Sequence, residues 1–252
     1  MTASTTDTDL WAADWHTWRA GRIAEATAAH GTAAAVGTHW LGEEPIRIDG
    51  LPGTWSVADG RVAGTGPDGL RVDLRPGGEH LLGRLLLRPV ARAGELAVRV
   101  FDPRAVTRIG LEGIDAFVPD RAWVIDGVAE EISAALRLDH IDGFVSTNAA
   151  ARIHLAIGGR DITFDGVRTP TGHTQITFAD TTNGGETQRF RFLTVPPPDD
   201  SGRVSVDFNR AHLPPCTFSD HYLCPLPPAA NRLDIPIRAG ETRLRHSDSA
   251  SR

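Results

Sequence analysis

The pattern of apolar and polar positions changes near residue 45. Before that point, Trp11, Trp15 and Trp18 recur at helical spacing, and Gly31 can end the helix. The pattern predicts one amphipathic α-helix over residues 8–31. The three tryptophans form either a ligand-stacking wall or an aromatic stripe packed on a sheet, and general burial preferences favour the stripe.

From about residue 45 onward, short alternating runs are separated by turn residues every 8–12 positions. Two of these runs, 54–58 and 61–65, are joined by Asp59-Gly60, which is a strong two-residue hairpin signal. Later expected strands include residues 106–111, 122–126, 130–138 and 233–238. This succession predicts a mainly β fold, an antiparallel sandwich, roll or barrel, preceded by one N-terminal α-helix.

The length of 252 residues suits one large domain preceded by an N-terminal helix. The central expectation is a single β-rich domain over residues 45–245, with the N-terminal helix packed on its core. The remaining segments expected from the sequence are a disordered N-terminus at 1–7, a Pro-rich structured loop at 209–231 and a disordered tail at 246–252.

The charge balance limits the partners. The net charge of −6 does not favour binding to nucleic acid or to an anionic membrane, which attract basic surfaces. No apolar run approaches the roughly 20 residues of a membrane helix. The first residues carry neither a basic nor an apolar signal region, so a cytoplasmic location is the default expectation.

The chain contains no lysine, because all 26 basic residues are arginine. A Schiff-base lysine and a phosphate-binding P-loop lysine are therefore excluded. Neither a Gly-x-Ser-x-Gly elbow nor a His-Glu-x-x-His motif occurs. Acid–base chemistry would fall to Asp, Glu, His, Cys or the single tyrosine, Tyr222.

The segment from Asp180 to Glu241 is dense in polar side chains that alternate with prolines. Arginine forks in such a segment suit carboxylate and phosphate groups. The alternative is a proline-stiffened arm whose Asp, Asn and Arg side chains satisfy buried backbone groups. The candidate ligand-binding residues are Asp180, Thr182, Arg191, Asp207, Asn209, Arg210, Asn231 and Arg232.

Within this segment, His212, Cys216, His221 and Cys224 supply the ligand types of a structural zinc site. Their spacings match no familiar zinc finger or knuckle. A disulfide, or two reduced thiols beside a tight loop, is the competing interpretation and is favoured over zinc.

The same segment contains a series of short motifs, with Asp180, Thr182 and Arg191-Phe192-Leu193 upstream of them: Asp207-Phe208-Asn209-Arg210-Ala211, Pro214-Pro215-Cys216, Cys224-Pro225-Leu226-Pro227-Pro228, Asn231-Arg232-Leu233 and Ala239-Gly240-Glu241. Through these motifs the chain resembles a bacterial family called domain of unknown function 1684. The resemblance is strongest toward the C-terminus and covers nearly the whole chain. It implies a family name without a reaction, cofactor or partner. The chain differs from the family at His212, Gln188 and His221, where tyrosine is usual.

These observations leave three functions open. The first is a module that binds a small polar or anionic molecule near the C-terminal segment. The second is a hydrolase or isomerase of small metabolites, in which Asp180 or Asp207 acts as base with His212, Cys216 or His221 as partner. The third is a structural zinc-containing protein. The binding module is preferred, and whether the chain is an enzyme stays open.

Overall fold

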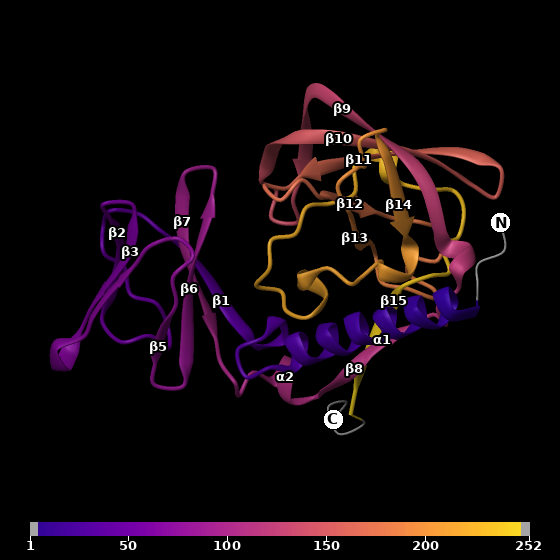
Figure 1. Ribbon diagram of the computed structural model, residues 1–252. Coiled ribbons are helices and arrows are strands. Elements are labelled where there is room, and N and C mark those ends of the chain that lie inside the picture. The colour runs from indigo at the N-terminus through magenta and orange to yellow at the C-terminus, as the bar shows by residue number, and fades with distance from the viewer. Residues whose placement is uncertain (1–4, 248–252) are drawn as a thin grey trace. The chain divides into compact units, whose positions relative to one another are not determined.

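The computed structural model describes residues 5–247, which divide into two compact units (Figure 1). The first unit contains the chain up to Ile23, Glu112–Thr217 and Leu223–Arg245. The second contains Ala24–Leu111, Phe218–Tyr222 and the residues from His246. The sequence predicts one β-rich domain over 45–245, whereas that range contributes to both units.

The long N-terminal helix, α1, spans Thr5–Thr27. It begins before the predicted range of 8–31 and ends before Gly31, so part of the segment predicted as disordered at 1–7 is helical. Residues 1–4 and 248–252 lie outside the described residues, as does most of the predicted tail at 246–252. His246 ends the last strand.

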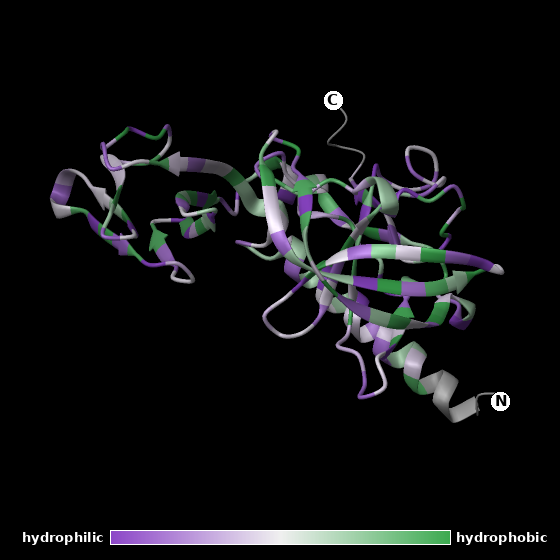
Figure 2. Cartoon of the chain, turned by 90° about the horizontal axis from the view of Figure 1, so that it is seen from above, coloured by the Kyte–Doolittle hydropathy of each residue, from purple (hydrophilic) through white to green (hydrophobic). Residues whose placement is uncertain are grey.

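The fold class is confirmed. Strands hold 47% of the chain and helices 17%, so the protein is mainly β with antiparallel sheets, one of them curled into a half-barrel. Figure 2 shows the alternation of hydrophilic and hydrophobic positions along the strands that this class requires. None of the helices that the structure describes is long and apolar enough to cross a membrane.

The first unit is built on a six-stranded antiparallel sheet in the order β13-β12-β11-β10-β9-β14. The edge strands β13 and β14 approach each other without forming a hydrogen-bonded ladder, so the sheet is curled but open. A separate pair joins β15 to β8. The strands are β8 (Leu111–Ala116), β9 (Val124–Asp139), β10 (Val145–Ile157), β11 (Arg160–Arg168), β12 (Thr174–Phe178), β13 (Arg191–Val195), β14 (Arg203–Asp207) and β15 (Glu241–His246).

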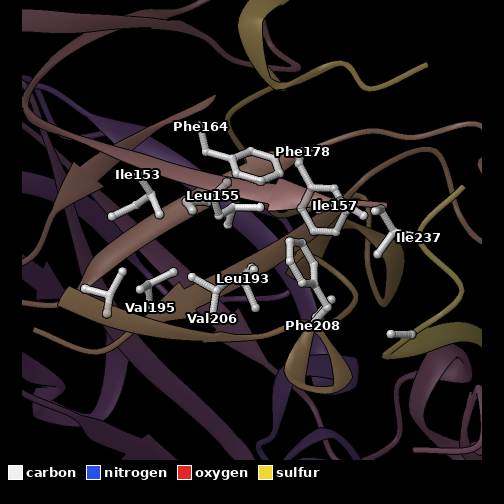
Figure 3. Close-up of a cluster of buried hydrophobic side chains, with 14 residues drawn as sticks. Ile153, Leu155, Ile157, Phe164, Phe178, Leu193, Val195, Val206, Phe208 and Ile237 are labelled. Carbon is white, nitrogen blue, oxygen red and sulfur yellow. The ribbon is translucent and has the colours of Figure 1, made fainter. Parts of the chain in front are cut away.

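The core of this unit lies inside the curl, where alternate side chains of each strand meet (Figure 3). The rings of Phe164, Phe178 and Phe208 pack against one another with centroids 6.1–6.2 Å apart. On β10, Ile153 and Leu155 are buried while their neighbour His154 is exposed. Each such apolar side chain stabilises the fold by about 1.5–3 kcal/mol, and the alternation gives the sheet an outer polar face.

The second unit holds a four-stranded sheet, β1-β7-β6-β5, and a three-stranded sheet, β2-β3-β4. Asp59 and Gly60 both have positive φ, at 50° and 69°, in the turn between β2 and β3, so the predicted hairpin is confirmed. Trp55 is fully buried in the core. The elements are β1 (Ala35–Leu41), β2 (Thr54–Ala58), β3 (Arg61–Thr65), β4 (Arg71–Leu74), β5 (His80–Leu82), β6 (Leu85–Arg92), β7 (Glu95–Phe101) and α2 (Val106–Ile109).

Three strand predictions are corrected. Residues 106–109 form the helix α2 instead of a strand. The backbone N–H of Ala105 donates to the Asp102 carbonyl in a turn, and this turn leads into the helix. Residues 122–126 and 130–138 are not two strands: apart from the first two residues they belong to the single long strand β9. Gly127 lies inside it, where a Cβ would approach the His154 carbonyl oxygen to 2.8 Å. Residues 233–238 form no strand, because side chains rather than a neighbouring strand bind the backbone of Ile237.

Candidate functional site

A buried ion pair lies at the centre of the polar segment. The side chains of Asp180 and Arg191 are withdrawn from solvent, and the Arg191 guanidinium donates to Oδ2 of Asp180 at 2.7 Å. The same guanidinium donates to the backbone carbonyls of Ile237 and Ala239. Burial lowers the pKa of Arg191, and the charge of Asp180 opposes that shift. The pair therefore anchors residues 237–239 of the chain.

The second carboxylate oxygen of Asp180 is also occupied. Oδ1 accepts from the backbone amide of Thr182 at 2.8 Å, from its hydroxyl at 2.6 Å and from the amide of Ile237 at 3.3 Å. The Thr182 hydroxyl in turn contacts that of Thr187 at 2.8 Å. With both oxygens bonded inside the protein, this carboxylate is not available as a catalytic base.

Two buried asparagines act as substitutes for a strand partner. The side-chain amide of Asn209 accepts through Oδ1 from the backbone N–H of Asp120. Through Nδ2 it donates to the backbone carbonyl of Asp120, and both distances are 2.9 Å. Asn231 does the same with Asp165, at 2.9 and 2.7 Å, and donates further to the Thr177 carbonyl at 2.8 Å. Each side chain therefore satisfies backbone groups that no neighbouring strand reaches.

Five of the eight candidate ligand residues thus hold the C-terminal segment against the curled sheet. This is the role of the structural arm that the sequence offers as the alternative to a ligand site. Arg232, by contrast, is exposed. The five are Asp180, Thr182, Arg191, Asn209 and Asn231.

The other two candidates, Asp207 and Arg210, line an open pocket of about 580 Å³, called here the tryptophan pocket. Its walls come from the N-terminal part of α1, from β9, β13 and β14, and from the loop after β14. The lining residues are Trp11, Trp18, Val124, His173, Thr194, Pro196, Ser205, Asp207, Arg210 and His212.

Asp207 and Arg210 form the polar centre of this pocket. Oδ2 of Asp207 accepts from the Trp11 indole at 3.2 Å and lies 3.5 Å from Nε of Arg210. The Arg210 guanidinium also pairs with Asp14 and lies over the Trp18 ring, 5.8 Å from its centroid. Polar and aromatic groups therefore meet on one wall.

The middle tryptophan of the stripe attaches the helix. Trp15 is buried and its indole donates to the Asn209 carbonyl at 2.9 Å. The fully buried Glu241 accepts from Arg22 at 3.1 and 3.2 Å and from the Leu213 amide at 2.8 Å. These bonds fix α1 in place, so Trp11 and Trp18 stand as a preformed wall.

His212 contributes a neutral imidazole to the same pocket. Its Nδ1 lies 3.2 Å from the Arg210 carbonyl, which only accepts, so Nδ1 carries the proton and Nε2 keeps its lone pair. Burial, reinforced by the charge of Arg22, lowers the pKa of His212 to about 4. The ring also packs edge-on against Phe192, with centroids 6.0 Å apart.

For Trp11 and Trp18 the sequence favours a packed aromatic stripe over a ligand-stacking wall, and it does not point to His173 or Ser205. The tryptophan spacing is the signal that was present, because Trp11 and Trp18 flank Trp15 on one helix face. His173 and Ser205 lie in segments far apart in the sequence, and no spacing connects them.

Cys216 and Cys224 are thiols in the structure, and the Cys216 amide lies 3.3 Å from the Cys224 sulfur. His212 faces the tryptophan pocket, whereas His221 belongs to the second unit. Over residues 5–247 no group of three or more His, Cys, Asp or Glu side chains is placed to hold a metal ion, so the predicted zinc set does not form such a group.

Comparison with known proteins gives a family and a structural neighbour. An uncharacterised protein of Haloarcula marismortui, solved by solution NMR, is similar at 22% identity and a TM-score of 0.44, covering 52% of this chain and 76% of its own. No curated protein matches the sequence. The family described as "Protein of unknown function (DUF1684)" matches residues 110–242, which is more than half of the chain. The protein therefore belongs to the DUF1684 family.

Proposed function

We propose that the tryptophan pocket binds a small planar polar molecule. The observation that carries this proposal is the meeting of Trp11 and Trp18 with the Asp207–Arg210 pair around one cavity of about 580 Å³. Ligand pockets of drug-sized molecules usually measure roughly 300–1,000 Å³ and combine apolar walls with a few placed polar groups. Indole faces suit flat ligands, and the polar pair would fix their orientation.

The charges favour a neutral or weakly basic ligand over an anion. Arg210 is already paired with Asp207 and with Asp14, so two carboxylates surround one guanidinium. An anionic ligand would have to displace one of them. Of the two ligand classes that the sequence leaves open, the polar uncharged class fits the pocket better.

The enzymatic alternative is weaker in this pocket. Asp207 and His212 both line it, as the hydrolase or isomerase hypothesis requires. A general base works best with a pKa near the operating pH, whereas the pKa of His212 is about 4. At neutral pH this imidazole is unprotonated but only weakly basic, so it suits accepting a ligand hydrogen bond.

Native mass spectrometry of freshly purified, untagged protein tests the proposal. We expect a mass excess over the denatured chain that corresponds to a small organic molecule, and its loss in Trp18→Leu. Trp40→Leu is the matched control, because Trp40 also lies beside an arginine, Arg92, but belongs to the second unit. A bare chain mass, together with no change in tryptophan fluorescence on adding free nucleobases, would contradict the proposal.

A further inference from the structure

A second cavity of about 220 Å³ lies at the turn between β9 and β10 and is called here the serine pocket. It belongs entirely to the first unit and shares no lining residue with the tryptophan pocket. Its lining residues are Leu138, His140, Ser146, Asn148, Val167, Thr169, Gln175, Thr177, Phe192 and Pro225.

A serine and a histidine are hydrogen-bonded to each other in this pocket. Nε2 of His140 lies 2.9 Å from Oγ of Ser146. Nδ1 of the same ring lies 2.9 Å from the Leu223 carbonyl oxygen. A carbonyl only accepts, so the proton of the neutral ring is on Nδ1, and Nε2 accepts from the Ser146 hydroxyl. This is the tautomer that a serine nucleophile requires of its base.

The backbone carbonyl of Leu223 orients the His140 ring, as a buried aspartate orients the histidine of a catalytic triad. The His140 ring is held further by Phe144, whose ring packs edge-on with centroids 5.5 Å apart. The backbone of His140 also pairs with Pro225 across an isolated bridge. The base therefore has a fixed position and a fixed tautomer before any ligand arrives.

Asn148 completes the constellation. Its Nδ2 donates to Oγ of Ser146 at 2.8 Å, which leaves the serine hydrogen directed at His140. The side chains of Gln175 and Thr177, which carry amide and hydroxyl donors, line the same cavity. Donors of this kind stabilise the oxyanion that forms when a serine attacks a carbonyl.

We propose that Ser146 is the nucleophile of an ester-hydrolysing site, with His140 as its general base. Oγ attacks the ester carbonyl carbon while Nε2 takes the hydroxyl proton. The C–O bond to the alcohol then breaks, and the imidazolium returns the proton to the leaving oxygen. Water, deprotonated by Nε2, attacks the acyl-serine, and the proton passes back to Oγ as the carboxylic acid leaves. This hydrolysis requires no oxidant and no cofactor.

The cavity restricts the substrate to short acyl groups. Its volume of about 220 Å³ is below the roughly 300–1,000 Å³ of drug-sized sites. The apolar walls are Leu138, Val167, Phe192 and Pro225. An uncharged, small acyl ester suits these walls better than a long chain or an acidic group.

A similar set of side chains elsewhere on the sheet provides a built-in comparison. Thr163, His154 and Glu130 are linked by contacts of 3.2 and 2.9 Å, so a hydroxyl, an imidazole and a carboxylate are also connected there. His154 and Glu130 are 45% and 52% exposed on the outer face of the sheet, and none of the three lines the serine pocket. Of the two sets, the Ser146 set lines the serine pocket, in which a substrate can sit.

Labelling of the wild-type chain with a fluorophosphonate, located by peptide mass spectrometry, is the first experiment. We expect modification of Ser146 and hydrolysis of p-nitrophenyl acetate above the buffer rate. Ser146→Ala and His140→Gln should each lower this hydrolysis by on the order of 10²–10⁴-fold. Thr163→Ala, in the comparison set outside the serine pocket, should leave it unchanged.

The labelling result stands without the variants, because it uses the native protein. A folded wild-type chain that takes no label at Ser146 would overturn the proposal, and so would Ser146→Ala retaining the wild-type rate. This outcome is separate from ligand binding in the tryptophan pocket, since the two cavities share no residue.

Discussion

Two aspartate–arginine pairs in the same polar segment of the sequence have different surroundings. Asp180 and Arg191 are 0% exposed at both side chains and 2.7 Å apart. Asp207 and Arg210 are 16% and 31% exposed and 3.5 Å apart. The Asp180 carboxylate and the two terminal guanidinium nitrogens of Arg191 bond to groups of residues 182 and 237–239, whereas the second pair borders a cavity. The same two residue types therefore support the fold at one place and line an open pocket at the other.

The physical reason is the local dielectric. A charge buried without water depends on its partner, so removing one member leaves an uncompensated charge. A pair at a pocket wall keeps contact with solvent, so its members can exchange partners at little cost.

Loss of the buried guanidinium should have the largest effect. Arg191→Leu leaves the Asp180 carboxylate buried and unpaired, and we expect the free energy of unfolding to fall by about 3–5 kcal/mol. Urea-induced unfolding followed by circular dichroism at pH 7 measures it. Arg210→Leu is the control, with a change below about 1 kcal/mol. Equal losses in the two variants would remove the distinction between the pairs.

Loss of a backbone-mimicking amide should come next. Asn231→Leu deprives the Asp165 amide and carbonyl and the Thr177 carbonyl of a partner. We expect a loss of about 3 kcal/mol, since each of these three buried groups costs at least about 1 kcal/mol when it is left unsatisfied. The neighbouring exposed Arg232→Leu should change stability by less than about 0.5 kcal/mol. A stable Asn231→Leu protein would show that water replaces the amide.

The buried imidazole should make stability depend on pH. The pKa of His212 is about 4 in the folded protein, below its ordinary value of 6.5. Between these values the unfolded chain binds a proton that the folded protein does not, so stability falls as the pH drops. From pH 7 to pH 5 we expect a loss of about 2 kcal/mol from this group.

The His212→Gln variant checks that expectation. Its unfolding free energy should depend less on pH over the same range than that of the wild-type protein. His246→Gln, on an exposed side chain, should keep the wild-type slope. An unchanged slope in His212→Gln would show that another group titrates there.

The Arg210→Ala variant should change the unfolding free energy least and ligand binding most. Arg210→Ala removes a partly exposed pair, so the unfolding free energy should change by less than about 1 kcal/mol. The mass excess attributed to a bound molecule should nevertheless disappear from the native spectrum. Retention of that excess in Arg210→Ala would place the ligand elsewhere.

Much of the fold is readable from local patterns. Alternation along the chain predicts the antiparallel strands, and the Asp59-Gly60 dipeptide predicts the turn between β2 and β3, because both depend on neighbouring residues. The prediction fails where a distant group intervenes. Residues 233–238 alternate like a strand, but the side chains of Asp180 and Arg191 bind the backbone of Ile237 in place of a neighbouring strand.

The candidate site was identifiable only as a region. The sequence points to the segment 180–241 as polar and ordered, and its composition suits both a ligand site and a structural arm. The spacing of residues does not show that Asp180 is buried in a structural ion pair and that Asp207 lines a pocket. That difference depends on which groups the folded chain brings against each carboxylate. His140 and Ser146 are close in the sequence, but the carbonyl of Leu223, which fixes the ring, is not.

The sequence alone determined the mainly β class, the N-terminal helix, the absence of lysine chemistry and the family, because propensity, composition and motif are properties of the chain itself. The division into two units, the partners of each buried charge and the two cavities required the tertiary structure. Burial and hydrogen bonding between distant residues decide whether the same side chain supports the fold or faces a ligand.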